Sequence, residues 1–171
     1  MLSFFIFISG LFSLAEAGTS WEIKILPATP YLFQEINAPI AQNRIKDLQL
    51  KAHTHVDALA LNAKKYPAKF EPRFFYRIDV VKFQLLDVGQ IVLKESEKIP
   101  ADKIRTFPGG RYFVINFEGP GSKINETFSR ITDLLKEAGV EADSPVITYY
   151  KKSALNFSSE KIQIFIKLKN K

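Results

Sequence analysis

The chain has 171 residues, of which 46% are hydrophobic and 25% charged, and it contains no cysteine. This length and composition fit one globular domain rather than a disordered chain, and the lack of cysteine excludes disulfides, thiolate metal sites and a lipid-modified N-terminal cysteine. The net charge of +6 is spread along the chain without a nucleic-acid recognition motif, so we interpret it as a contribution to solubility and expect no nucleic-acid partner.

The first seventeen residues have the pattern of an export signal. Residues 2–14 are almost wholly apolar, and Ala15-Glu16-Ala17 then gives the small-x-small sequence that signal peptidase reads. The apolar run is shorter than the roughly 20 residues that a membrane-spanning helix needs. No Lys or Arg precedes the run, and an uncleaved anchor or a buried strand is the alternative. We predict a signal peptide at residues 1–17, a mature domain at 18–171, export to the periplasm or the exterior, and no stable membrane span after cleavage.

The first half of the mature chain predicts a strand, a second strand, a helix and further strands. Residues 21–26 and 31–36 are strand-like, and residues 41–62 are helix-like because their apolar side chains recur every three or four positions. The positions that set this helical face are Ile45, Leu48, Ala52, Val56 and Leu59. Residues 70–86 alternate as a strand does, residues 87–89 (Asp-Val-Gly) predict a turn or bulge, and residues 90–94 resume an extended run. Residues 95–103 then form a polar connector.

The second half repeats this order. A strand at 112–117 leads into a helix with Ser122 as its N-cap and Gly139 as its left-handed C-terminal cap. The apolar face of this helix is formed by Ile124, Phe128, Ile131, Leu135 and Ala138. Residues 146–150 and 161–168 predict the last two strands, so the chain reads β-α-β-β twice.

The two halves also share a local sequence. Residues 27–39 align without a gap on residues 108–120, with proline at both ends of each segment and Tyr31 opposite Tyr112. Chance is the alternative, since short strand–turn–helix segments use Pro, Gly and Tyr for local reasons. We predict an α+β fold of duplicated β-α-β-β units (about 21–94 and 104–168) with pseudo-twofold symmetry, an antiparallel sheet, two helices and a ligand cleft between the halves.

The motifs of the second half resemble those of the gyrase-inhibitor-like (GyrI-like) effector-binding family. These motifs are Pro-Gly-Gly-x-Tyr at 108–112 leading into a strand, the Gly119-Pro120 exit, an amphipathic helix, and Pro-x-x-x-Tyr at 145–149. The first half matches more loosely, with Ala38 in place of the usual glycine and Pro30 at the position of Arg111. The resemblance covers roughly residues 21–168.

This resemblance implies two β-α-β-β units with a small-molecule pocket between them. Family members often act as sensor domains of transcription regulators, while others stand alone and some hydrolyse cyclopropane-containing toxins. The residues before the first repeat leave no room for a helix-turn-helix domain, so we expect a stand-alone small-molecule-binding domain. The SOUL haem-binding family is similar in fold.

Strand alternation gives the candidate ligand-binding residues. One face of each repeated strand carries Leu32, Ile36 and Phe113, Phe117, which we expect to pack under the helices. The opposite face carries aromatic, amide and acidic side chains: Tyr31, Phe33, Glu35, Tyr112, Asn116 and Glu118. Aromatic rings stack on a flat ligand, and a carboxylate supplies the countercharge of a cation. We therefore predict a planar hydrophobic ligand, with cations favoured; an ordinary solvated sheet face is the alternative. The family resemblance adds Tyr149 and Glu160.

Two further functions remain open. In a hydrolase of a strained, cyclopropanoid small molecule, Glu118 or Glu160 would activate water while a tyrosine positions the substrate. In a SOUL-like haem protein, His55, at the edge of the first helix's apolar face, would be the axial ligand. Without haem we expect no cofactor and no metal. We expect a binding domain rather than an enzyme, and the sequence does not indicate an oligomeric state.

Overall fold

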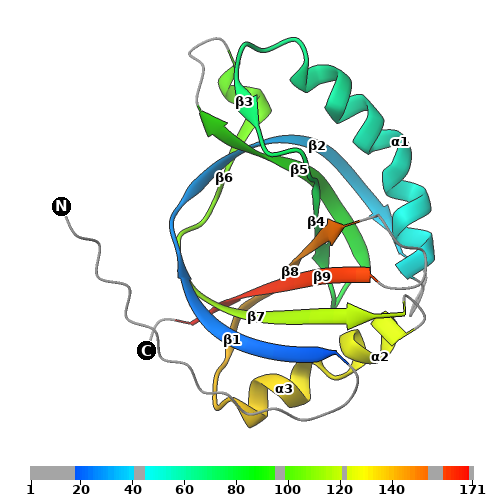
Figure 1. The fold of residues 1–171 in the computed structure, drawn as a ribbon, viewed down its shortest axis with the longest axis vertical. Helices are drawn as coiled ribbons and strands as arrows, with labels where there is room; N and C mark the ends of the chain where they lie inside the picture. Colours follow the sequence, from blue (N-terminus) through cyan, green and yellow to red (C-terminus); the bar gives the residue numbers. More distant parts are fainter. Residues whose placement is uncertain (1–17, 41–44, 95–98, 121–122, 154–159, 170–171) are drawn as a thin grey trace, which may run out of the picture.

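The computed structural model describes residues 18–40, 45–94, 99–120, 123–153 and 160–169. The predicted signal peptide at 1–17 lies outside them. Within these residues, a mostly antiparallel sheet curls into a half-barrel and the helices pack on its outer face (Figure 1), which confirms the α+β class. The strands are β1 (Thr19–Leu26), β2 (Thr29–Pro39), β3 (Lys69–Phe70), β4 (Phe75–Asp79), β5 (Gln84–Lys94), β6 (Ile104–Phe107), β7 (Gly110–Gly119), β8 (Ala142–Ser153) and β9 (Glu160–Leu168). The helices are α1 (Ile45–Ala63), α2 (Ile124–Ser129) and α3 (Ile131–Glu137), with a 3₁₀ turn at Ala101–Lys103.

The strand order shows the predicted duplication. It runs β1-β7-β9-β8-β4-β5-β2-β6, with β3 pairing β5 outside this path. Exchanging β1 with β6, β2 with β7, β4 with β8 and β5 with β9 gives the same order read from the other end. The leading strand of each half therefore pairs with the other half. Tyr31 pairs with Arg105 of β6 and Tyr112 with Lys24 of β1, so the two tyrosines occupy equivalent positions, as predicted.

Two short connections make the sheet curl. Pro27 and Ala28 join β1 to β2, and Pro108 and Gly109 join β6 to β7. Because β1 and β6 are the two ends of the strand order, each connection draws one end of the sheet toward the other. The ends meet at stacked rings of Phe107 and Tyr112, whose centroids are 5.1 Å apart at an interplanar angle of 22°.

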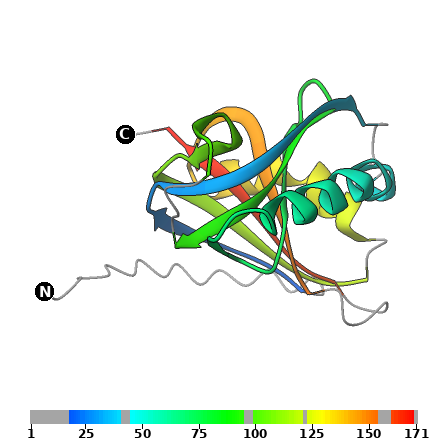
Figure 2. The same cartoon turned by 90° about the horizontal axis from the view of Figure 1, so that it is seen from above.

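The hydrophobic core lies between the outer face of the sheet and the helices, and Figure 2 shows α1 (cyan to teal) lying alongside the strands. Under α1, Leu32 of β2 and Val88 of β5 pack against Leu59 and Ala63. A larger cluster lies under α2 and α3, formed by buried residues that include Phe113, Ile115, Phe117, Ile124, Ile131, Leu134, Ile147, Ile162, Ile164 and Ile166. Burial of these apolar side chains is the main force that holds the helices on the sheet.

Of the turn or bulge predicted at residues 87–89, the turn is wrong, because these residues lie inside β5. An irregularity does lie beside Asp87, where the register shifts between the pairs Arg77–Asp87 and Ile78–Leu85. The chain reverses instead between β4 and β5, where Asp79 Oδ1 accepts hydrogen bonds from the backbone N–H groups of Val81 and Lys82 at 3.0 and 2.9 Å. Gly89 occupies a strand position because rings lie over it: a β-carbon there would be 2.3 Å from Phe75 Cζ and 2.7 Å from Tyr31 Cδ2. Space for these rings, rather than a turn, accounts for this glycine.

The second predicted helix is divided. Arg130, with φ −92° and ψ −3°, separates α2 from α3, so the described residues contain three helices instead of two. The predicted cap at Ser122 and residues 41–44 of the first helix lie outside the described residues. Gly139 has φ +64° and donates its N–H to Lys136 O at 3.0 Å, which confirms the predicted left-handed cap. None of the described helices combines the length and apolar character needed to span a membrane.

Candidate ligand-binding site

The strand register defines which side chains share the inner face of the half-barrel. Directly opposite residues of an antiparallel pair point to the same side of a sheet. One row of such partners crosses seven strands from β1 to β2: Glu22, Val114, Phe165, Thr148, Arg77, Asp87 and Glu35. Both halves of the chain therefore contribute to one continuous face, opposite the helices.

Aromatic side chains cover much of this face. Tyr31 and Phe75 are buried, with ring centroids 4.9 Å apart in an edge-to-face arrangement. Packed against them are the partly buried Phe33, Ile91, Phe107 and Phe165. We call these six residues the inner aromatic cluster. Because its outer members keep part of their surface exposed, the cluster offers ring faces and edges to an apolar ligand.

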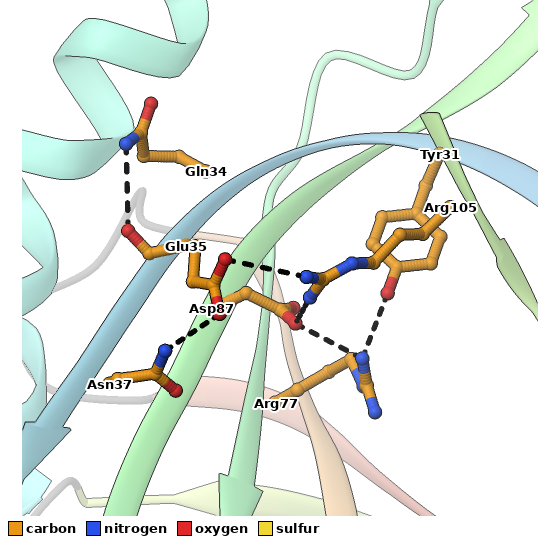
Figure 3. Close-up of polar contacts among 7 residues, drawn as sticks. All are labelled: Tyr31, Gln34, Glu35, Asn37, Arg77, Asp87 and Arg105. Atoms are coloured by element: carbon orange, nitrogen blue, oxygen red, sulfur yellow. Dashed lines mark hydrogen bonds and ion pairs between the residues drawn. The ribbon is translucent and has the colours of Figure 1, made fainter. Parts of the chain in front are cut away.

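A buried charge lies beside the inner aromatic cluster. The side chain of Asp87 is 0% exposed, and its Oδ2 accepts hydrogen bonds from Arg77 Nη1 at 3.0 Å and Arg105 Nη1 at 2.9 Å (Figure 3). Burial raises the pKa of Asp87, and the two guanidinium groups oppose that rise. Asp87 Oδ1 has no hydrogen-bond partner among the described residues.

The two arginines tie this charge to the aromatic rings. Arg77 Nη1 also donates to the Tyr31 hydroxyl at 3.0 Å, and burial raises the pKa of Tyr31. The Arg105 guanidinium carbon lies 3.8 Å from the centre of the Phe33 ring, a cation–π contact. Arg105 Nη2 also lies 3.5 Å from Glu35 Oε2, and Glu35 Oε1 accepts from Asn37 Nδ2 at 2.7 Å.

The equivalent positions in the second half are neutral. Asn116 pairs with Gln163 as Glu35 pairs with Asp87. Gln163 Nε2 donates to Asn116 Oδ1 at 2.6 Å, and Asn116 Nδ2 donates to Glu22 Oε1 at 3.0 Å. The inner face is therefore asymmetric. One half carries Arg77, Arg105 and Asp87, which we call the arginine–aspartate group, and the other half carries the amide pair of Asn116 and Gln163.

Tyr112 contributes a buried ring where the two halves meet. Its hydroxyl donates to the Pro108 carbonyl at 2.5 Å, and burial raises the pKa of Tyr112 to about 12. The first and last residues of the Pro-Gly-Gly-x-Tyr motif are thus joined by a hydrogen bond from the tyrosine hydroxyl to the proline carbonyl. This bond fixes the connection between β6 and β7.

The structure brings together five of the predicted site residues on the inner face. Tyr31, Phe33 and Glu35 surround the arginine–aspartate group, and Tyr112 and Asn116 lie on the same face of β7. Whether they bind a ligand stays a prediction.

The other predicted site residues lie apart from this group. Glu118, at the end of β7, is 56% exposed and pairs with Lys161 at 2.9 Å. Glu160 pairs with Gly119 and Tyr149 with Tyr76 and Ile164; their side chains are outside the described part of the structure. The register position beside Phe75 belongs to Tyr150.

His55 is partly buried on α1, a helix that packs on the outer face of β2 and β5. It therefore lies across the sheet from the inner aromatic cluster. Within the described ranges, no group of three or more His, Cys, Asp or Glu residues is placed to hold a metal ion.

Sequence reasoning missed the residues at the centre of the site. Asp87 was assigned to a turn because Asp and Gly are typical turn residues. The sequence places Arg77 in the strand-like run 70–86 and Arg105 at the start of the second repeat, and local patterns give neither residue a role. Alternation places Arg77 on one side of β4, but only the register of β4, β5, β2 and β6 brings both arginines to Asp87.

The fold is thus a curled sheet of two pseudo-symmetric halves that share an aromatic inner face. Residues 22–169 match the family described as "GyrI-like small molecule binding domain". The chain belongs to this family, which confirms the resemblance drawn from its motifs. No curated protein gives a significant match.

Solved structures with low sequence identity share the fold. The EcmrR C-terminal domain has a TM-score of 0.70 at 8% identity, over 90% of this chain and 99% of that one. In the EcmrR–DNA complex, this chain spans 58% of the longer EcmrR chain, with a TM-score of 0.66. SAV2435 bound to tetraphenylphosphonium has a TM-score of 0.53 at 10% identity, over 88% and 94% of the two chains. A hydrolase from Listeria innocua has a TM-score of 0.50 at 11% identity, over 87% and 91%.

Proposed function

We propose that this small-molecule-binding domain holds a planar hydrophobic ligand against the inner aromatic cluster. The observation that carries the proposal is the cluster itself, which combines the buried rings of Tyr31 and Phe75 with the partly exposed rings of Phe33, Phe107 and Phe165. Rings fixed by their neighbours lose little conformational freedom when a ligand stacks on them, so binding retains most of the gain from apolar contact.

The site favours binding over catalysis. The hydrolase hypothesis needs an acid in the site that acts as a general base. Of its two candidates, Glu118 is exposed and paired with Lys161, and it lies at the end of β7 rather than beside the inner aromatic cluster. Asp87 is in the site, but its Oδ2 already accepts from two guanidinium groups. SAV2435, the fold relative bound to tetraphenylphosphonium, supports a ligand rich in aromatic carbon.

The proposal is tested by titrating the ¹⁵N-labelled chain with 2-naphthamide, a neutral planar probe. Saturable shifts are expected at the backbone amides of Phe33, Gly89 and Phe107, while the amide of Leu59 on α1 stays unchanged. Phe33→Ala and Phe107→Ala should each weaken binding, and Val81→Ala, on the exposed β4–β5 turn, is the matched control. Binding that leaves these inner-face amides unshifted would contradict the proposal, as would unchanged affinity in both phenylalanine variants.

We also propose that the domain acts outside the cytoplasm. The support is the apolar run at residues 2–14 followed by Ala15-Glu16-Ala17, the pattern of a cleaved signal peptide. A ligand would then be met in the periplasm or the exterior.

A further inference from the structure

We infer that the ligand carries an acidic group, such as an aromatic carboxylate, which the guanidinium groups of Arg77 and Arg105 bind. This inference rests on the proposed function, since it names the chemical class of the ligand on the same inner face. It departs from the sequence-based expectation of a cationic ligand.

A ligand on the inner face contacts the exposed charges of the arginine–aspartate group. The side chain of Asp87 is 0% exposed, whereas those of Arg77 and Arg105 are 28% and 37% exposed. The buried carboxylate is therefore covered, and the accessible charges are the two guanidinium groups and the Glu35 carboxylate beside Arg105, which is 56% exposed. An anion placed against the guanidinium of Arg77 would be attracted by the charge that it touches, whereas a cation there would be repelled.

Arg77 and Arg105 use only part of their hydrogen-bonding capacity within the arginine–aspartate group. Arg77 uses Nη1 for Asp87 and Tyr31, and Arg105 uses Nη1 for Asp87 and Nη2 for Glu35. The hydrogen bonds of Arg77 to these two residues use Nη1 alone, and Figure 3 shows the rest of this guanidinium turned away from Asp87 and Tyr31. An edge with two parallel N–H directions suits both oxygens of a carboxylate.

The protein's own exposed acid competes only weakly with a ligand carboxylate for these guanidinium groups. Glu35 is 56% exposed and 3.5 Å from Arg105 Nη2, and an exposed ion pair of this kind stabilises little. A ligand carboxylate that also stacks on the inner aromatic cluster can therefore displace it. In the other half, the equivalent positions hold the amides of Asn116 and Gln163. The Glu22 carboxylate on that side already accepts from Asn116 Nδ2 at 3.0 Å and pairs with Lys24 at 2.8 Å.

The test uses three probes with the same ring system and different charge: 2-naphthoate, 2-naphthamide and 2-naphthamidinium. Their affinities are measured by calorimetry at pH 7 and physiological salt. We expect 2-naphthoate to bind tightest and 2-naphthamidinium weakest. Arg105→Gln should weaken 2-naphthoate by about tenfold, the order of one charge-assisted hydrogen bond, and leave 2-naphthamide nearly unchanged. Glu35→Gln should strengthen 2-naphthoate, because it removes the competing carboxylate.

Lys169→Gln is the matched control, since it removes one positive charge from an exposed side chain that follows the end of β9 and pairs with Glu141, and it should change none of the three affinities. If 2-naphthamidinium binds tightest, or if Arg105→Gln weakens the acid and the amide equally, the acidic ligand is excluded while the binding function stands. If none of the three probes shows saturable binding, the proposed function fails and this inference with it. Should Arg105→Gln not fold, the exposed Glu35→Gln decides, and unchanged or weaker 2-naphthoate binding in that variant overturns the inference.

Discussion

Gly109 lies directly against Ala28, so that a β-carbon on Gly109 would be 2.8 Å from the Ala28 backbone nitrogen. These residues belong to the two connections that are equivalent in the duplicated fold, β1 to β2 and β6 to β7. The connections therefore touch each other where the ends of the sheet meet. The inner face is shaped by this contact, because it sets how closely β6 and β1 approach.

Gly109→Ala should lower the free energy of unfolding by about 1–3 kcal/mol, the usual range for overpacking against a neighbour that cannot move away. Urea unfolding followed by circular dichroism measures the change. Gly119→Ala is the matched control: the three atoms nearest to its β-carbon would all belong to the Phe117 ring, the first at 3.2 Å, and a ring can shift. Equal losses in the two variants would show that the contact between the connections has no special weight.

Asp87→Asn should destabilise the fold by about 1–3 kcal/mol, because it disrupts the hydrogen bonds that both guanidinium groups donate to one buried carboxylate oxygen. The carboxylate accepts from both Arg77 and Arg105, and an amide cannot balance two guanidinium groups. Asp102→Asn removes the same charge from a 70% exposed side chain paired with Lys103 and should change stability little. Chemical unfolding of the two variants makes the comparison, and a loss for Asp87→Asn no larger than that for Asp102→Asn would contradict the prediction.

Alkaline pH should weaken the fold partly through Tyr112. Its pKa in the folded protein is about 12, raised by burial from an ordinary value of 10.0. The folded state therefore holds this proton more tightly than the unfolded chain does. The resulting stabilisation is complete below pH 10 and is lost as the pH rises toward 12.

Urea unfolding at pH 9 and pH 11 measures this loss. Tyr112→Phe has no hydroxyl to ionise, so its stability should fall less between the two pH values than that of the natural sequence. The variant is less stable at pH 9 because the bond to Pro108 is gone, but the prediction concerns only the difference between the two pH values. Parallel decline in both proteins would contradict it.

Export predicts a defined mature N-terminus. Protein recovered from its host should begin at Gly18, within a few residues, because signal peptidase cleaves after Ala17 in the small-x-small pattern. N-terminal sequencing together with cell fractionation makes the measurement. Recovery from the cytoplasm with Met1 still present would contradict export and leave the ligand prediction untouched.

The sequence by itself determined the class of the fold and its duplication. Apolar spacing predicted both helical regions and most strands, because one-sided burial imposes a period on any helix or strand that covers a core. The sequence alignment of Tyr31 with Tyr112 predicted two equivalent halves. Alternation along the strands separated Leu32 and Phe113, which pack under the helices, from the side chains on the inner face.

Only the tertiary structure decided the centre of the site. Asp87 and Gly89 read locally as a turn, but rings from β2 and β4 cover Gly89, and arginines from β4 and β6 meet Asp87. These contacts join residues that are distant in the sequence, so no local pattern records them. These contacts depend on the strand register. The sequence of a strand determines which face a side chain lies on, but only the pairing with neighbouring strands determines which charges that side chain contacts.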